Sequence, residues 1–193
     1  MAVPPRRVVT GHDPHGKAIV SMDGPPAVIV TNALQPGLAF FELWNTASVP
    51  VQVDSGDDPT ASRKPDTDPP DGGVVIRMVD LPPEGSNGPA LDPEQAARLF
   101  ASVGLKAAGG MHKTSRHPLM HRTESVDFGI VLWGEVHLIL DDQEVHLHAG
   151  DVVVQRGTIH AWSNRTDKPC RMAFILVDGR YDERLAALLP EKH

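Results

Sequence analysis

The sequence predicts a mainly β protein folded as a small barrel or jelly roll, and three observations support this prediction. Short runs of β-branched and aromatic residues lie between clusters of Gly, Pro and Asp, which is typical of strands joined by turns. Apolar and polar residues alternate along 136–148, as on a strand with one buried face. The expected strands of the second half follow one another closely through tight turns, which favours a barrel or a double sheet.

The composition is that of one globular domain. A chain of 193 residues with 40% hydrophobic residues can bury a single core. The net charge of -7 argues against nucleic-acid and anionic-membrane partners. Cys170 is the single cysteine, which excludes an internal disulfide and favours a reducing compartment. With no apolar signal segment and no run of about 18 apolar residues, the sequence predicts a cytoplasmic protein.

The chain divides into three parts by composition. Residues 1–109 are predicted to form an N-terminal extension packed on the barrel, 110–178 the barrel itself, and 179–193 a C-terminal helix and tail. Within the extension, residues 54–73 are rich in Pro, Asp and Gly and are expected to be an exposed loop. Additional strands are expected at 7–10, 17–21, 27–31, 40–44 and 74–79, extending the edges of one sheet or exchanging with a partner subunit.

One or two short helices interrupt this β pattern. The clearest helix is expected at 91–103, where Asp92 can cap the first turn and Pro93 can occupy the first helical position. Its apolar residues then fall on one face, and Gly104 ends it. A second short helix is expected at 182–189, before Pro190.

Histidines and carboxylates gather in two segments of the predicted barrel. His121 and Asp127 lead into a strand that ends at a glycine turn, and His160 follows soon after on another strand. Two imidazoles and a carboxylate that converge from neighbouring strands can hold one divalent metal and leave coordination positions open. An unpaired carboxylate at the head of an apolar strand is costly, so Asp127 is expected to have a metal, an arginine or a backbone amide as its partner.

Other residues compete for these roles. Glu124 could supply the carboxylate instead of Asp127, and His117 could join through a flexible loop, with a loop residue outside the metal site as the alternative for each. His112 is a weaker candidate. Three histidines on one predicted hairpin are expected to decorate one face of the sheet, with a second metal site there as a minor alternative: His137, His146 and His148.

Four further residues are candidates for substrate binding. Arg122 and Arg156 lie beside the candidate ligands and could bind an anionic substrate through paired hydrogen bonds, unless they face solvent. Trp133 and Trp162 flank the same segments and could line an apolar pocket, or pack on the outside of the barrel.

The second half of the chain resembles the cupin superfamily, in particular small single-domain bacterial cupins with an RmlC-like β-barrel. The segment Asp127-Phe-Gly-Ile-Val-Leu-Trp-Gly134 is similar to the carboxylate-to-glycine half of the first cupin motif, with Asp in place of Glu. Gly150-Asp-Val-Val-Val opens the second motif, and His160-Ala-Trp-Ser-Asn164 closes it. The resemblance covers about residues 110–178 and implies a cupin-type double-stranded β-helix that often carries a metal on its inner wall.

The sequence departs from the cupin motifs at two places. There is no His-x-His pair, because Leu119 and Thr123 flank His121 at two residues. His121 also lies one residue further from Asp127 than the second histidine of the family would, which a β-bulge could absorb. The Pro-x-Gly turn of the second motif is replaced by Gln155-Arg-Gly157.

The resemblance leaves three functional classes open. The first is a metal-dependent enzyme with one divalent Fe, Mn, Ni or Zn ion that acts on a small organic acid or aromatic substrate, as a dioxygenase, decarboxylase or isomerase. The second is a non-catalytic cupin that binds a small molecule or a metal. The third is a metal-free, epimerase-like cupin in which His121 and Asp127 form the His–Asp pair. A homodimer is also expected from the resemblance.

Overall fold

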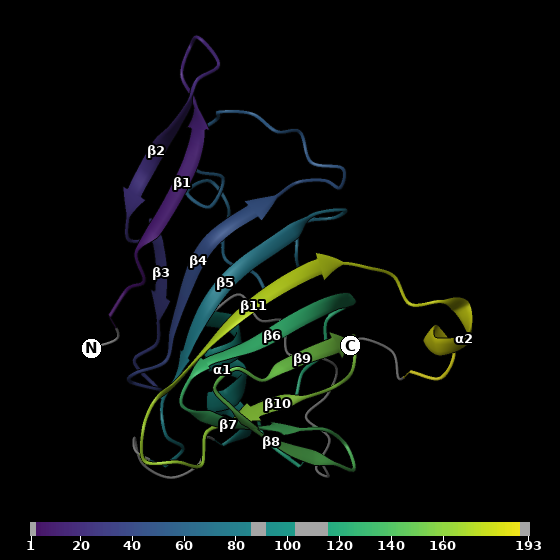
Figure 1. Ribbon diagram of the computed structural model, residues 1–193. Helices are drawn as coiled ribbons and strands as arrows, with labels where there is room; N and C mark the ends of the chain where they lie inside the picture. The colour runs from purple at the N-terminus through teal and green to yellow at the C-terminus, as the bar shows by residue number, and fades with distance from the viewer. Residues whose placement is uncertain (1–2, 86–91, 103–115, 190–193) are drawn as a thin grey trace.

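The computed structural model describes residues 3–85, 92–102 and 116–189, and most of its regular structure is antiparallel β-sheet (Figure 1). The mainly β class with a few short helices is therefore confirmed. The strands are β1 (Arg7–His12), β2 (Ala18–Gly24), β3 (Val28–Thr31), β4 (Ala39–Thr46), β5 (Val74–Leu81), β6 (Ser125–Trp133), β7 (Glu135–Ile139), β8 (Glu144–His148), β9 (Val152–Arg156), β10 (Ala161–Ser163) and β11 (Cys170–Asp178).

The larger sheet combines both halves of the chain. Its six strands run in the order β3-β4-β5-β11-β6-β9, so β5 from the first half pairs along its length with β11 from the second. The expectation that the early strands extend one sheet is confirmed for β3, β4 and β5. They form one half of that sheet, and the cavity-facing side chains of β4 and β5 belong to the same interior as those of β6 and β11.

A smaller sheet of order β10-β7-β8 packs against the larger one. The apolar residues of alternate positions meet between the two sheets, where Val131 and Met172 of the larger sheet contact Val136, Leu138 and Leu147 of the smaller one. Burial of such side chains contributes about 1.5–3 kcal/mol each. This core closes one end of the sandwich, and the cavity described below lies next to it.

The strands β1 and β2 form a separate two-stranded ribbon that projects from the larger sheet (Figure 1). Arg7 ties the ribbon to the rest of the protein, because its guanidinium donates to the carbonyl of Leu43 at 3.0 Å and to the carboxylate of Asp58 at 2.6 Å.

Two helices complete the described structure. In α1 (Pro93–Ser102), Gln95 N donates to Asp92 Oδ1 and Asp92 N donates to Gln95 Oε1, a reciprocal capping arrangement that starts the helix. The ends predicted at Leu91 and Val103, the boundary at 109/110, and His112 lie outside the described residues. The terminal helix is shorter than predicted: α2 spans Glu183–Ala186 and is capped by Asp182. In the described part of the chain, no helix has the length and apolarity needed to cross a bilayer.

The loop 54–73 differs from its expectation as an exposed segment. Thr60 and Thr67 are buried within it, with 2% and 8% of their surface exposed. The carbonyl of Asp66 accepts a hydrogen bond of 2.5 Å from Arg77 Nη2. A buried guanidinium needs such acceptors, so the polar loop is held against β5 and forms part of the interior wall.

Candidate metal and ligand site in the interior

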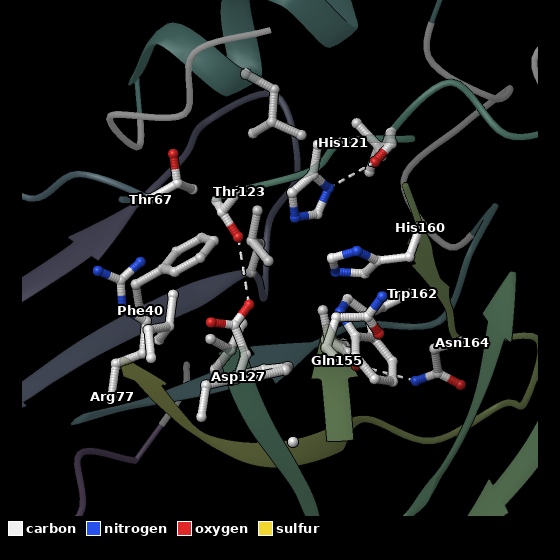
Figure 2. Close-up of a pocket in the computed structure, with 18 of the residues that line it drawn as sticks. Phe40, Thr67, Arg77, His121, Thr123, Asp127, Gln155, His160, Trp162 and Asn164 are labelled. Carbon is white, nitrogen blue, oxygen red and sulfur yellow. Dashed lines mark hydrogen bonds between the residues drawn. The ribbon is translucent and has the colours of Figure 1, made fainter. Parts of the chain in front are cut away.

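A cavity lies inside the sandwich and is lined by residues from both halves of the chain (Figure 2). It has a volume of about 130 Å³, enough for about four water molecules at the roughly 30 Å³ that each occupies in the liquid. Most of its surface is apolar, with contributions from Leu38, Phe40, Val79, Leu99, Phe174 and Leu176. Ligand sites are typically of this kind, with an apolar wall and a few polar groups.

His121 and His160 face each other at this cavity. The two residues form an isolated antiparallel bridge, in which each backbone N–H donates to the carbonyl of the other at 2.8 Å. Directly paired residues project to the same side of a sheet, and their ring centroids accordingly lie 4.4 Å apart (Figure 2). The two imidazoles predicted to meet from distant positions in the sequence are thus neighbours in the folded chain.

Backbone carbonyls fix the orientation of both rings. Nδ1 of His121 lies 3.0 Å from the carbonyl of Leu119, and Nδ1 of His160 lies 3.0 Å from the carbonyl of Thr158. A carbonyl oxygen can only accept, so Nδ1 carries the proton in each ring and the lone pair of the neutral imidazole is on Nε2. This is the tautomer that binds a metal through Nε2.

Burial keeps both imidazoles neutral. Desolvation lowers the pKa of His121, and it lowers the pKa of His160 to about 3, with a further contribution from the charge that His121 would carry. A protonated ring cannot ligate a metal. The pair therefore offers neutral donors throughout the physiological pH range.

Asp127 is the third polar group of the cavity that the sequence singled out. Its side chain is buried, with 6% of its surface exposed, and its Oδ2 accepts a hydrogen bond from Thr123 Oγ1 at 3.3 Å. Its Oδ1 is also buried and has no hydrogen-bond partner among the described residues. Burial raises the pKa of Asp127 to about 6, against smaller opposing contributions from Ser125, Thr123 and Arg77.

This raised pKa has a consequence for stability. Native Asp127 binds a proton more tightly than the unfolded chain does, so its contribution favours folding below pH 4 and is lost as the pH rises to about 6. We expect Asp127→Asn to raise the free energy of unfolding by about 2–3 kcal/mol at pH 8 and by little at pH 4. Urea unfolding of the chelator-treated protein at both pH values measures the difference.

The exposed Asp142 offers the matched control, because Asp142→Asn changes the same chemical group outside the interior. A gain in stability from Asp127→Asn that is equal at pH 4 and pH 8 would contradict the assigned ionisation. Comparison with the unsubstituted chain at each pH cancels the opposite contribution of His160, whose depressed pKa removes stability as the pH falls below about 6.5.

The chemical types of the donor atoms in the cavity suit a divalent metal. Two neutral imidazoles and a buried carboxylate with an unpartnered oxygen are suitable ligands for Fe, Mn, Ni or Zn. As a set, however, the ligand atoms of His121, His160 and Asp127 do not lie within 4.8 Å of one another. The histidine pair is therefore the assembled part of the site, and Asp127 stands apart from it on β6.

Thr123 corrects the sequence interpretation of the first motif. Residues 121, 123 and 127 all line the cavity, because alternate positions face the same side. His121 thus takes the place of the first histidine of the His-x-His pair, and Thr123 stands where the second would be. No extra residue has to be absorbed between His121 and Asp127, so the β-bulge that could have absorbed one is not needed. The register shift of β6 lies elsewhere, opposite Arg171/Met172.

Several candidate residues do not line the cavity. The carboxylate of Glu124 accepts from the backbone N–H of Tyr181 at 2.8 Å, on the side of the C-terminal segment. Nε2 of His117 lies 2.9 Å from the carboxylate of Glu84, which itself reaches the cavity. The structure thus separates Glu124 and His117 from the histidine pair.

The candidate substrate-binding residues divide in the same way. Trp162 lines the cavity and makes edge contacts with His160 and Phe174. Trp133 is 42% exposed, and the guanidinium of Arg171 lies over its ring. Arg122 and Arg156 are not among the residues that line the cavity.

Arg77, Glu42 and Gln155 are cavity or near-cavity residues that the sequence interpretation missed. Arg77 Nε lies 3.1 Å from Glu42 Oε1, and both side chains are nearly fully buried. Gln155 is opposite Asp127 on β9, where its amide donates to Thr158. A signal for Arg77 existed in the sequence, since it is the one charge within the apolar run 74–79, a position that demands a buried partner.

A family model and several relatives match the part of the chain that carries the two cupin-like motifs. The family model described as "Cupin domain" matches residues 108–177. "Phomopsin biosynthesis cluster protein C'" of Diaporthe leptostromiformis is 31% identical over 91% of this chain and 79% of its own length. "Cupin-domain-containing oxidoreductase virC" of Hypocrea virens is 30% identical over 89% of this chain and 75% of its own length. A solved "Cupin 2 conserved barrel domain protein" from Salinispora arenicola is 18% identical, with a TM-score of 0.39 over 82% of this chain and 91% of that one. With relatives matched over most of its length, and with the cavity-facing histidine pair in place, this chain belongs to the cupin family.

Proposed function

We propose that this protein is a metal-dependent cupin oxidoreductase that acts on a small aromatic or otherwise largely apolar substrate. The observation that carries the proposal is the histidine pair: two neutral rings, each anchored through Nδ1, at an apolar cavity. The relatives named as cupin-domain-containing oxidoreductases, from Hypocrea virens and Neurospora crassa, support the reaction class.

In this proposal His121 and His160 hold one divalent Fe, Mn, Ni or Zn ion, and the carboxylate of Asp127, which stands apart from the pair, faces the same cavity. A metal held by the two imidazoles would supply Lewis-acid polarisation of a substrate oxygen, or redox chemistry if the metal were iron. The carbonyls of Leu119 and Thr158 keep the rings in the ligating orientation, which avoids reorganisation on binding.

The charges of the cavity favour an apolar substrate over an organic acid. Arg77 is already paired with Glu42, and Asp127 adds a further acidic group. The arginines expected to bind an anion, Arg122 and Arg156, do not line the cavity. A substrate carboxylate would therefore depend on the metal for its positive charge, whereas an aromatic ring can pack against Phe40, Trp162 and Phe174.

Asp127 also fits a role in proton transfer. A general acid or base works best when its pKa is near the working pH, and burial brings the pKa of this carboxyl to about 6. The hydrogen bond from Thr123 holds Oδ2, and Oδ1 remains for a ligand or a proton.

A chromophoric probe tests the proposal without knowledge of the natural substrate. We expect 4-nitrocatechol, an aromatic chelator, to change its visible absorption when it is added to the full chain loaded with iron. The change should be absent in His160→Ala, and Trp162→Ala should weaken probe binding while iron remains bound. Bound iron in the cavity with no change in probe absorption would contradict the proposed open coordination positions.

A second candidate is a metal-free cupin isomerase, which the raised pKa of Asp127 favours. A protein that contains no metal after chelator-free purification, and whose melting temperature does not respond to Fe, Mn, Ni or Zn, would favour this candidate or a non-catalytic binding protein over the oxidoreductase.

We also propose that the protein forms a homodimer in the cytoplasm. The outer face of β6 and of the edge strand β9 supports this, because Phe128 and Val154 are directly opposite each other and are 37% and 55% exposed. Neighbouring Val152 is 58% exposed. Apolar patches of this kind are commonly covered by a partner. Light scattering should give twice the chain mass of 20.8 kDa; a monomer at micromolar concentration would exclude the dimer.

A further inference from the structure

The β7–β8 hairpin carries a second cluster of metal-ligating side chains, outside the cavity. Glu135 is paired with His148 across the two strands, and His137 is paired with His146. Alternate residues of a strand face the same side, so these two cross-strand pairs, with Val136–Leu147 between them, place one carboxylate and three imidazoles on one face. The opposite face of the hairpin, with Val136, is part of the core.

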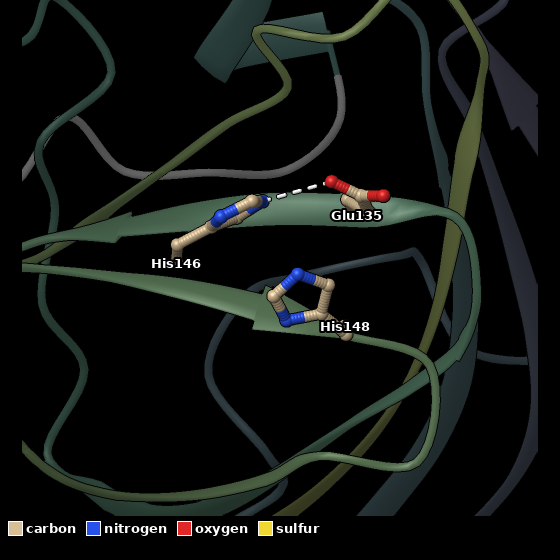
Figure 3. Close-up of side chains that lie close together, drawn as sticks. All are labelled: Glu135, His146 and His148. Atoms are coloured by element: carbon tan, nitrogen blue, oxygen red, sulfur yellow. Dashed lines mark hydrogen bonds and ion pairs between the residues drawn. The ribbon is translucent and has the colours of Figure 1, made fainter.

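Three of these residues already lie close enough to share an ion. One ligand atom each of Glu135, His146 and His148 lies within 4.8 Å of the other two (Figure 3). His146 Nε2 and Glu135 Oε2 are 2.9 Å apart. A tetrahedral zinc ion with bonds of roughly 2.0–2.2 Å holds its ligands about 3.3 Å apart, so the cluster needs only small side-chain rotations to close around a metal.

The surroundings hold His146 in place for this role. The ring of His137 is stacked on that of His146, with centroids 4.3 Å apart and an angle of 2° between the planes. This stacking limits the rotation of the His146 ring, so its Nε2 stays directed toward Glu135.

We propose that Glu135, His146 and His148 form a binding site for a divalent transition metal, separate from the histidine pair in the cavity. Two imidazoles and one carboxylate bind zinc well, and the affinity order of the first-row metals predicts tighter binding of copper. The ion connects β7 to β8 in the folded chain, so its binding stabilises the hairpin. The cluster is accessible to the solvent, with side-chain exposures of 42% for His146 and 59% for His148.

Zinc titration of a full chain that carries His121→Ala and His160→Ala tests this site alone. Calorimetry should show one zinc ion per chain in that background, and zinc should raise the melting temperature. Adding His148→Ala or Glu135→Gln should weaken zinc binding by more than about tenfold, since even residues that only support a ligand change metal affinity by 10–100-fold. Copper bound to the same background should show coupling to two imidazole nitrogens by electron paramagnetic resonance.

The matched control is His12→Ala, which removes an exposed histidine from β1, on another hairpin. It should leave zinc affinity and stoichiometry unchanged. If zinc binds equally well after His146 and His148 are both replaced, the hairpin site is wrong. Because the cavity histidines are already absent in these proteins, the result is independent of the proposed oxidoreductase function.

Discussion

Replacing His160 by alanine is expected to reduce the metal content of the cavity from nearly one ion per chain to background. Among the described residues, His160 supplies one of the two imidazoles that line the cavity, and its ring is held for ligation by the carbonyl of Thr158. Since loss of a residue that merely supports a ligand costs 10–100-fold in affinity, loss of the ligand itself should cost at least about 100-fold. Elemental analysis of protein purified without chelator or nickel resin measures the effect.

The hairpin cluster must be removed for this measurement to be clear. The reference protein and each cavity variant should therefore carry His146→Ala and His148→Ala, so that a metal bound at the hairpin is not counted. His121→Ala should cause the same loss as His160→Ala, and His12→Ala should cause none. Circular dichroism checks that each variant is folded. A near-stoichiometric metal content in both His121→Ala and His160→Ala would exclude the histidine pair as the metal site.

The second large effect is expected on stability, from the buried pair Arg77–Glu42. Both side chains are almost inaccessible, with 4% and 6% of the side-chain surface exposed. Removing one member of such a pair leaves an uncompensated buried charge and costs about 3–5 kcal/mol. We expect Glu42→Gln to lower the free energy of unfolding by this amount, as measured by urea unfolding at pH 7.

Replacement of both members should behave differently. Burial raises the pKa of Glu42 and lowers the pKa of Arg77, so desolvation outweighs the attraction between them. A double variant, Glu42→Leu with Arg77→Met, removes both desolvation costs at similar volume and should recover most or all of the stability lost in Glu42→Gln. A double variant that is as unstable as the single one would show that shape, rather than charge, determines the effect.

The histidine pair could be predicted from the sequence because each histidine belongs to one of the two segments that resemble the cupin motifs. A strand that ends at Gly134 and a turn at Gly157 fix which residues face inward, and the period of two then places His121 and His160 on inner positions. The mutual backbone hydrogen bonds of the bridge follow from that register. The same alternation predicted that the histidines of the β7–β8 hairpin share one face. The position of Glu135 beside His146 and His148 could not be predicted, because it depends on which residues of β7 and β8 are paired.

The rest of the cavity could not be predicted because it depends on contacts between distant segments. Arg77 and Glu42 meet only because β4 pairs with β5 inside the larger sheet. Thr67 reaches the interior because the carbonyl of Asp66 satisfies the guanidinium of Arg77. Composition alone made the 54–73 loop look exposed, since it has few apolar residues, and a hydrogen bond to a buried charge outweighed that tendency.

The larger sheet combines strands from both halves of the chain. As a result, the residues that would hold the metal and those that would select a substrate lie in different parts of the sequence. The candidate metal-holding residues lie between 121 and 160, whereas much of the wall that would select a substrate comes from residues 35–84 and from α1. Substitutions in the early strands can thus change which substrate fits the cavity while His121 and His160 are unchanged. Proteins built this way can change their substrate through substitutions in the N-terminal half while they keep the same metal ligands.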